Sequence, residues 1–553
     1  MNDASAKESE ATPPPPPVSD RQCNGGRLVR VPGGSITGKA TGPAMLMAAR
    51  VRTSTLDQIT RDPARVQAIQ EETLLTHCRR GADTEFGRQH GLGRVRSVQD
   101  YRQAVPLRPY AEFEPWLERM RRGERNILHP EFIEYYGCSS GTSDTAAKNK
   151  YLPVSREQIG WQQKAGFDIA ARYVQMTGDV AFTGGFVLYL FPPAVIRKEG
   201  PVGISSNPGL MLLHLPRVSR MISLPKPPLR DIENYDRKLD AIADTYLSHD
   251  VRVMSGTTCW FSNLFDRLLM AARRRGMNAK TVSDIWPNLR VLFGGGVHAE
   301  PYREIIAQRV GRKIPIIDNY NATEGGIFAV SDRLDDPGMA MIPDRAVYFE
   351  FVPREQHGRS DGRRYALWEV EAGVEYSVVV TTCSGLYAYY MGDFIRFTSV
   401  YPHRIEFTGR ASGVLSITQE LVTFLEIERA VRHALKETDS AAVEFSCGAE
   451  IGISDSAKGR YQLFIEFENT PADLQAFAQA FDGELCRQNR VYREHRQSDV
   501  AILAPQVVAL PSGAMRKFVE RIGRNGPQQK FPHIVDDAKR DVLRGLGSVA
   551  ASP

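Results

Sequence analysis

The spacing of apolar and polar residues changes along the chain. Between residues 44 and 125 apolar positions recur three and four apart, as in the run that starts at Pro63, and this spacing is typical of amphipathic helices. From residue 126 onward, short apolar runs at 251–254 and 289–293 alternate with helical patterns, such as the one at 261–275. Strands that alternate with helices on this scale predict an α/β domain with a partly parallel sheet.

A smaller unit is predicted after residue 410. It carries helical patterns at 425–436 and 471–481 and strand patterns at 461–467 and 500–503. We therefore expect a large N-terminal domain at 44–410 and a small C-terminal domain at 411–553. Residues 1–43 are rich in Pro, Gly, Ser and charge and contain few large apolar side chains, so we expect a disordered tail there.

The composition indicates an ordinary globular protein and excludes several other classes. The 553 residues are 42% apolar and 24% charged, which is ordinary for a globular chain. Lys and Arg number 70 against 65 Asp and Glu, so we expect no nucleic-acid partner. No apolar run reaches the roughly 18 residues that cross a membrane, and the first residues lack the apolar core of a secretion signal. Seven scattered cysteines without a CxxC pair favour reduced thiols in the cytoplasm.

A glycine flanked by small hydroxyl residues, and followed by lysines, lies at 137–153. Backbone N–H groups and hydroxyls around a glycine can wrap a phosphate, and a lysine can neutralise it. A polar surface turn is the alternative. Residues 137–141 also match the G-x-S-x-G pattern of serine hydrolases, but the polar sequence that follows does not suit the apolar helix which that site requires. The candidate phosphate-binding residues are Ser139, Ser140, Gly141, Thr142, Ser143, Lys148 and Lys150.

Two further motifs end apolar strands. Gly295 and Gly296 belong to three consecutive glycines that let a flat ligand approach the backbone. About 20 residues later, Tyr320 is expected to stack on a base, Thr323 to donate to a phosphate and Glu324 to hold Mg²⁺. Simple strand-end turns are the alternative interpretation of these residues.

A third motif runs from Gly385 to Asp393. An aspartate that follows a glycine at a strand end can accept both hydroxyls of a ribose, and Arg410 is expected to reach the same ribose or the α-phosphate. Asp393 as a turn residue that bonds its own backbone is the alternative. Thr258, Trp260 and Phe261 follow the apolar run at 251–254 and are candidates for the wall of a ligand pocket, although core packing explains Trp260 and Phe261 as well.

Together these motifs resemble the GH3 acyl-acid amido synthetases of the adenylate-forming superfamily, over roughly residues 50–540. The serine loop with its lysine, the Tyr-x-x-Ser/Thr-Glu motif at 320–324 and the Tyr-x-x-Gly-Asp motif at 389–393 carry the resemblance. A Phe-Thr-Gly-Arg hinge at 407–410 and the late lysine Lys530 also match. The chain departs from the family pattern at Ala322, Leu421 and His533, and Lys148 competes with Lys150 for the loop lysine.

The resemblance implies a large adenylate-forming α/β domain with a smaller, mobile α+β lid. It also implies that MgATP and a carboxylic acid form an acyl-adenylate, which an amine, usually of an amino acid, then attacks. Lys530, Glu324 and Thr142 are the implied catalytic residues. A thioester ligase and a nucleotide-binding protein without turnover remain alternatives of the same fold. We expect a monomer.

Overall fold

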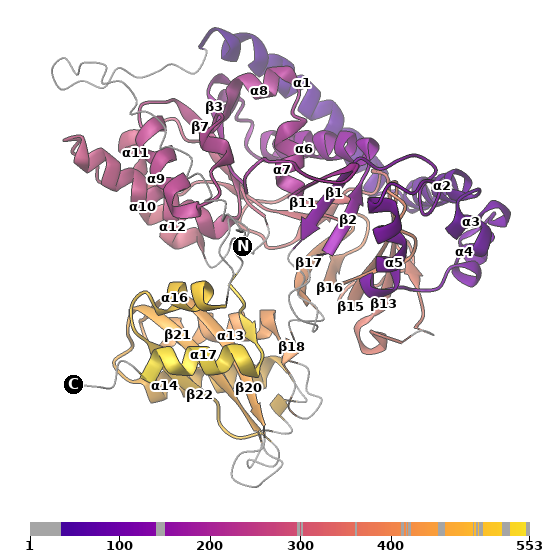
Figure 1. The fold of residues 1–553 in the computed structure, drawn as a ribbon. Helices are drawn as coiled ribbons and strands as arrows, with labels where there is room; N and C mark the ends of the chain where they lie inside the picture. The colour runs from indigo at the N-terminus through magenta and orange to yellow at the C-terminus, as the bar shows by residue number, and fades with distance from the viewer. Residues whose placement is uncertain are drawn as a thin grey trace, which may run out of the picture.

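The computed structural model describes residues 35–139, 150–295, 302–359, 362–410, 422–451, 459–489, 502–522 and 531–548, with 299, 414–415, 417, 492–493 and 496. Figure 1 shows a large body, which ends at β17 (Arg404–Arg410), and a smaller body formed by later residues. Helix α1 (Ser35–Thr60) begins inside the expected tail, and residues 1–34 lie outside the described residues. None of the described helices combines the length and the apolar character needed to cross a lipid bilayer.

Helices form the N-terminal part, as the spacing predicts. Asp62 caps α2 by accepting hydrogen bonds from the N–H groups of Ala64 and Arg65, and Pro63 occupies the first helical position, where its missing N–H does no harm. The helices are α2 (Pro63–Gly81), α3 (Glu85–Gln89), α4 (Val98–Ala104) and α5 (Tyr110–Arg121).

A five-stranded parallel sheet, ordered β6-β3-β7-β8-β9, lies at the centre of the α/β part. Figure 1 shows α9, α10 and α12 on one side of β3 and β7, and α1, α6 and α7 on the other. Because both faces are covered, the strands are almost continuously apolar. The strands are β3 (Phe186–Leu190), β6 (Ser223–Leu224), β7 (Val251–Gly256), β8 (Val291–Phe293) and β9 (Ile316–Ile317). The helices that accompany them are α8 (Arg217–Ile222), α9 (Tyr235–Tyr246), α10 (Thr258–Arg274), α11 (Val282–Ile285) and α12 (Arg303–Val310).

A mixed four-stranded sheet, ordered β2-β1-β5-β4, holds the ends of the serine loop. Ser155 caps the long helix α6 (Arg156–Thr177), and Gly178 ends it in the left-handed conformation. The strands are β1 (Tyr135–Ser139), β2 (Lys150–Val154), β4 (Arg197–Glu199) and β5 (Val202–Ser205), and α7 (Asn207–Leu213) follows them.

Residues 319–410 depart from the expected alternation of strands and helices. They form an eight-stranded sheet in which the neighbouring strands run antiparallel, and its apolar face packs against α2–α5. The strands follow one another through turns, so no helical periodicity separates them. They are β10 (Asn319–Ala322), β11 (Gly326–Ser331), β12 (Met339–Met341), β13 (Val347–Pro353), β14 (Tyr365–Ala366), β15 (Glu375–Thr382), β16 (Tyr389–Ser399) and β17.

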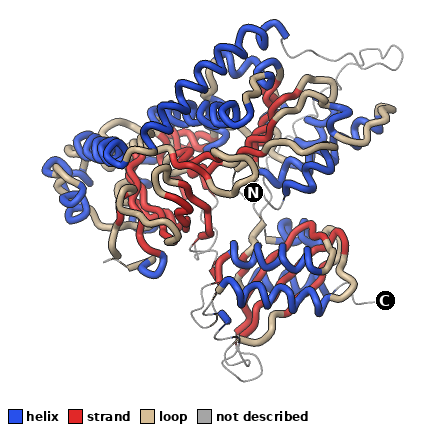
Figure 2. The backbone as a smooth tube through the Cα atoms, turned by 180° about the vertical axis from the view of Figure 1, so that it is seen from behind, coloured by secondary structure: helices blue, strands red, loops and turns tan. Residues whose placement is uncertain are grey.

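The small body is α+β, as predicted. Its four-stranded sheet, ordered β22-β21-β20-β23, is covered on both faces, by α13 and α14 on one and by α16 and α17 on the other, and Figure 2 shows it from behind. Of the strand predicted at 500–503, residues 500–501 lie outside the described residues, Ile502 makes an isolated bridge to Gly459, and β22 starts later. The elements are β18 (Val414–Leu415), β19 (Val422–Thr423), α13 (Phe424–Glu437), β20 (Ala441–Ile451), β21 (Gly459–Asn469), α14 (Leu474–Gln488), β22 (Gln506–Leu510), α16 (Ala514–Arg521), β23 (Ile534–Val535) and α17 (Asp537–Ser548).

Candidate active site

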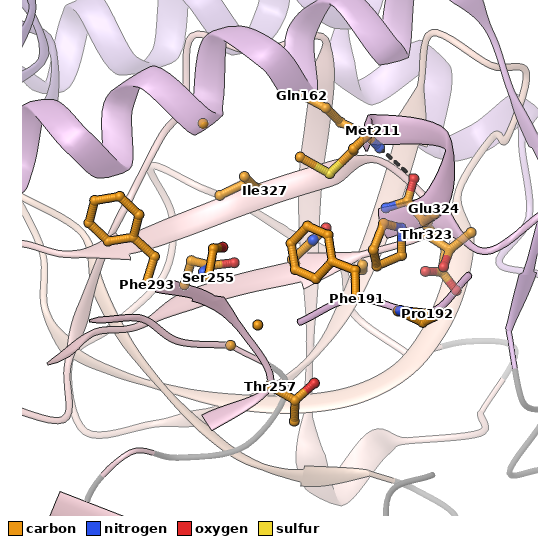
Figure 3. A pocket seen from close by; sticks show the side chains of 18 of the residues that line it. Gln162, Phe191, Pro192, Met211, Ser255, Thr257, Phe293, Thr323, Glu324 and Ile327 are labelled. Carbon is orange, nitrogen blue, oxygen red and sulfur yellow. Dashed lines mark hydrogen bonds between the residues drawn. The ribbon is translucent and has the colours of Figure 1, made fainter. Parts of the chain in front are cut away.

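A cavity of about 1020 Å³ lies in the large body. Its lining includes residues of the parallel sheet, of α6 and α7, of the ends of β1 and β2, and of β10, β11 and β16 in the antiparallel sheet. Figure 3 shows the side chains of Phe191, Met211, Phe293 and Ile327 around it, with Thr323 and Glu324 at one side. Segments far apart in the sequence therefore share one hollow.

At the polar end, β10 and β16 place Tyr320 behind Asp393. The Tyr320 hydroxyl donates to Asp393 Oδ2 over 2.7 Å, and both residues are buried. The Tyr320 ring packs against Phe328 and Phe407. Among the described residues that line the cavity, Asn319 and Asn321 appear and Tyr320 does not. Tyr320 is thus placed to orient Asp393, whereas the sequence predicted that it stacks on a base.

The strand pairing brings Arg410 next to Asp393. β16 and β17 are antiparallel, and Asp393 is the register partner of Arg410. Only the backbone of Arg410 is described. Its predicted reach toward the ribose therefore remains a prediction, although the two residues are neighbours across the ladder.

Thr323 and Glu324 follow β10 directly and line the cavity. The side-chain amide of Gln158 donates to the Thr323 carbonyl over 2.9 Å. Strand β1 passes so close that a Cβ at Gly137 would lie 2.3 Å from Thr323 Cγ2. Helix α6 and β1 together hold this turn.

The glycine segment after β8 forms another part of the wall. The Gly294 N–H donates to the Ile317 carbonyl over 2.9 Å, and both Gly294 and Gly295 line the cavity. A Cβ at Gly294 would lie 2.5 Å from Thr258 Oγ1. Thr258 is fully buried behind this glycine, and Gly296 lies outside the described residues.

The serine loop is described only at its two ends. Ser139 pairs with Lys150 in the β1–β2 ladder, and Lys150 lines the cavity, with its Nζ 5.6 Å from the Tyr110 ring centre. The side chain of Ser139 and the rest of the loop lie outside the described residues, so the choice between Lys148 and Lys150 stays open. Besides Gly296, the predicted residues outside the described part are Ser140, Gly141, Thr142, Ser143, Lys148 and Lys530.

The predicted acid wall is divided between the cavity and the core. Trp260 lines the cavity at 7% exposure. Phe261 is fully buried in the cluster beneath α10, and among the described lining residues neither Phe261 nor Thr258 appears. Successive helical residues point in directions about 100° apart, so adjacent positions of α10 cannot all face one hollow.

Sequence reasoning missed several lining residues. Gln162 of α6 donates to Asn207 over 2.9 Å, and both are almost fully buried. Gln158 and Gln162 are four residues apart on the buried face of α6, and two amides at helical spacing beside the apolar Ile159 and Ala165 were a usable signal. His357 also lines the cavity, and burial lowers the pKa of its imidazole. The local sequence around His357 contains no pattern that predicts a cavity-lining residue.

Comparison with known families decides what the chain is. The model described as the GH3 family N-terminal domain matches residues 55–201, the GH3 family central domain matches 340–410, and the GH3 family C-terminal domain matches 425–539. These segments cover more than half of the chain. It belongs to the GH3 family.

Curated relatives align with this chain over nearly its whole length. This GH3 protein is 24% identical over 570 residues to jasmonoyl–L-amino acid synthetase GH3.5 of Oryza sativa subsp. japonica, covering 89% of this chain and 95% of the relative. It is 22% identical over 565 residues to indole-3-acetic acid-amido synthetase GH3.4 of Arabidopsis thaliana, covering 87% and 90%.

Solved structures place the fold. The AtGH3.15 acyl acid amido synthetase in complex with 2,4-DB superposes with a TM-score of 0.74 at 19% identity, covering 91% of this chain and 96% of that chain. A 2-hydroxyisobutyryl-CoA ligase in the postadenylation state gives 0.57 at 15% identity, covering 89% and 93%. The fold of this GH3 protein is therefore that of adenylate-forming ligases, with a large N-terminal part and a smaller C-terminal part.

Proposed function

We propose that this GH3 protein is an ATP-dependent acyl acid amido synthetase. It activates a carboxylic acid as an acyl-adenylate and transfers the acyl group to the amine of an amino acid. One observation carries the proposal: Lys150, Gly295, Glu324 and Asp393 come from four separate segments and line one cavity, which continues into an apolar chamber. An anionic nucleotide and an apolar acid need these two environments side by side.

The groups at the polar end suit a magnesium nucleotide. Asp393 offers carboxylate oxygens for ribose hydroxyls, and we propose that the flat base lies against the backbone at 294–295, which lines the cavity. Glu324 would hold Mg²⁺, which is commonly bound by one or two carboxylates together with phosphate oxygens and water. Among the described residues no group of three or more His, Cys, Asp or Glu side chains could hold a metal ion by itself, so we propose that phosphate oxygens and water complete the coordination of Mg²⁺ beside Glu324. When bound, the ion supplies charge neutralisation at the phosphates.

The first proposed step joins two anions. A carboxylate oxygen attacks the α-phosphorus, a new O–P bond forms, the bond to the β-phosphate's bridging oxygen breaks, and pyrophosphate leaves. Because like charges approach each other, cationic and hydrogen-bonding groups should contribute most of the rate enhancement. Lys150 is one such group. Thr142 and Lys530, with the hydroxyls of the serine loop, are proposed for the same purpose.

The second proposed step forms the amide. The amine lone pair attacks the acyl carbon, the C–O bond to AMP breaks, AMP leaves with the bonding electrons, and the amine nitrogen loses a proton to solvent. Lys530 lies some 120 residues beyond the hinge at 407–410. We therefore propose that the small body changes position between the two steps.

Carboxylate-dependent exchange between ATP and labelled pyrophosphate tests the proposal. A panel of carboxylic acids should reveal at least one that supports exchange, and mass spectrometry with mixed amino acids should then detect an amide. Glu324→Gln and Asp393→Asn should each lower exchange about 10²-fold. Tyr348→Phe is the matched control, because the Tyr348 hydroxyl is buried without a hydrogen-bond partner among the described residues. Silence across a broad panel would favour a nucleotide-binding protein without turnover.

The thioester alternative has support from the fold alone, through the likeness to a CoA ligase. The thioester ligase and the amido synthetase are distinguished by the product that forms when coenzyme A and amino acids are supplied together. An amide supports the proposal, and a thioester with no amide contradicts it.

We also propose a monomer in a reducing cytoplasm. The described cysteine thiols, Cys78, Cys138, Cys383, Cys447 and Cys486, are all free, and burial raises the pKa of each of them. Such thiols are unreactive, which supports the proposal as far as the five described cysteines are concerned. Size-exclusion chromatography with light scattering would reveal a dimer if the proposal is wrong.

A further inference from the structure

The apolar end of the cavity has a floor made by three neighbouring parallel strands. Tyr189 of β3 is the register partner of Ser255 of β7, and Ser255 is the partner of Phe293 of β8. All three residues line the cavity. Val187 and Val253 form the next row of this face, because residues two apart on a strand point the same way. The floor is therefore one side of the parallel sheet.

Helices and one strand of the antiparallel sheet cover this floor. Phe167 of α6, Met211 of α7 and Ile327 of β11 line the cavity, and Figure 3 shows Met211 and Ile327 above Ser255 in this view. A Cβ at Gly166 of α6 would meet no atom within 4 Å. The chamber is thus lined with aromatic and aliphatic groups and has space beside α6.

Charged groups are confined to the polar end. Of the described lining residues, those with carboxylate or ammonium groups are Glu114, Lys150, Glu324 and Asp393. None of them belongs to the sheet floor or to the helices above it. A ligand charge placed in this chamber would be buried without a counter-ion, which is strongly unfavourable. The part of the acid away from its reacting carboxylate must be uncharged.

Two hydroxyls interrupt the apolar floor. Neither the Tyr189 nor the Ser255 hydroxyl makes a hydrogen bond to a residue that the structure describes, and both side chains are only partly exposed. Burial raises the pKa of the Tyr189 phenol to about 12, so the group stays a neutral donor. A tyrosine reaches further from a sheet than a serine, so the two hydroxyls lie at different depths of the chamber. A ligand that offers them no polar atom leaves both unsatisfied.

We propose that the chamber selects an aromatic monocarboxylic acid that carries an uncharged hydrogen-bonding substituent, such as a ring hydroxyl, and that Tyr189 and Ser255 bind this substituent. The inference rests on the proposed function and specifies its acid. Phe293, Phe191 and Phe167 supply ring contacts that a flat aromatic acid fills better than an alkyl chain. A site built to hydrogen-bond a hydroxyl discriminates against the analogue that lacks it, since the buried polar groups then stay unpaired.

Pyrophosphate exchange with matched acids tests the inference. The probes are benzoate, the three hydroxybenzoates, terephthalate as a dicarboxylate, and hexanoate. We expect at least one hydroxybenzoate to exceed benzoate in kcat/KM by about tenfold or more, and terephthalate and hexanoate to be poorer than that hydroxybenzoate. Tyr189→Phe or Ser255→Ala should reduce the ratio of hydroxybenzoate to benzoate toward one.

Two control variants separate recognition from a general loss of structure. Tyr348→Phe and Ser262→Ala each remove a buried hydroxyl that has no partner among the described residues and lies outside the cavity lining. Both should leave the ratio unchanged. A ratio near one in the wild-type protein, or a preference that survives in both test variants, overturns the inference.

Failure of the inference is distinguishable from failure of the proposed function. Exchange with other carboxylates but with none of the hydroxybenzoates overturns the inference and leaves the function standing. If no acid supports exchange, the function fails, and calorimetric titration with the hydroxybenzoates then decides the inference. Binding that weakens in Tyr189→Phe or Ser255→Ala supports it, while absent or unaltered binding overturns it.

Discussion

At the scale of single residues, the Tyr320–Asp393 hydrogen bond links two motifs that are 73 positions apart. Asp393 is 3% exposed, so its carboxylate depends on protein partners rather than on water. A buried acceptor that loses its donor is destabilised by the full desolvation penalty. The hydroxyl of Tyr320 therefore affects the site through Asp393, although the ring itself packs in the core.

Tyr320→Phe should raise the KM for ATP about tenfold in the exchange assay, with a smaller change in kcat. Its free energy of unfolding should fall by about 1–3 kcal/mol because Asp393 loses a donor. Tyr348→Phe, which removes a hydroxyl without a partner among the described residues, should change neither quantity. An unaltered KM for ATP in Tyr320→Phe would mean that Asp393 does not need this bond.

At the scale of elements, β1 lies so close to the turn after β10 that the residue of β1 at the contact must have no side chain. Gly137 faces Thr323, and no larger residue fits in the 2.3 Å that a Cβ would leave. The position of Thr323 and Glu324 thus depends on a glycine in another strand. The short motif at 320–324 therefore keeps its turn geometry through a contact with a distant strand.

Gly137→Ala should displace Thr323 and lower the exchange rate about 10²-fold, because a shift of about 1 Å at a reacting centre has an effect of that size. Gly160→Ala is the matched control, since a Cβ there meets no atom within 4 Å and alanine favours a helix by up to about 1 kcal/mol. The control should melt at the same or a higher temperature and keep its activity. Equal exchange rates in both variants would contradict the assigned role of β1.

At the scale of the whole molecule, the two bodies have separate cores. The small body contains Glu444, which is buried at 8% exposure, and this burial raises the pKa of its carboxyl to about 8. Glu428 of α13 and Glu466 of β21 add to this rise, and His533 Nδ1 lies 3.4 Å from Glu444 Oε1. The folded small body therefore keeps a proton that the unfolded chain releases.

This proton predicts a pH dependence of stability. Below about pH 4.5 Glu444 is protonated in both states, and between pH 4.5 and 8 only the unfolded state loses the proton, so stability falls as the pH rises. Glu444→Gln cannot ionise and lacks this loss, which amounts to at most about 5 kcal/mol. Calorimetry at pH 5 and pH 8.5 should show a larger drop for the small body's transition in the wild type than in the variant. Parallel behaviour would contradict the buried, protonated state.

Local sequence determined much of this protein. The helical run from Pro63, the helical pattern at 425–436 and the apolar strand at 251–254 were each predicted from a few neighbouring residues, and α2, α13 and β7 confirm them. The order of the motifs along the chain was enough to indicate the GH3 family. These features are readable because capping, turn chemistry and periodicity act over one or two turns of chain.

Only the tertiary structure decided which side chains face the cavity. The Tyr320 ring packs against Phe328 and Phe407. Phe261 lies in the core, whereas its neighbour Trp260 lines the cavity. Tyr189 and Ser255 are register partners on the adjacent strands β3 and β7. Each outcome depends on strand register and on the packing of distant elements, where a shift of one residue moves a side chain to the opposite face. Short-range patterns contain no information about that choice, because it is made by contacts between residues tens or hundreds of positions apart.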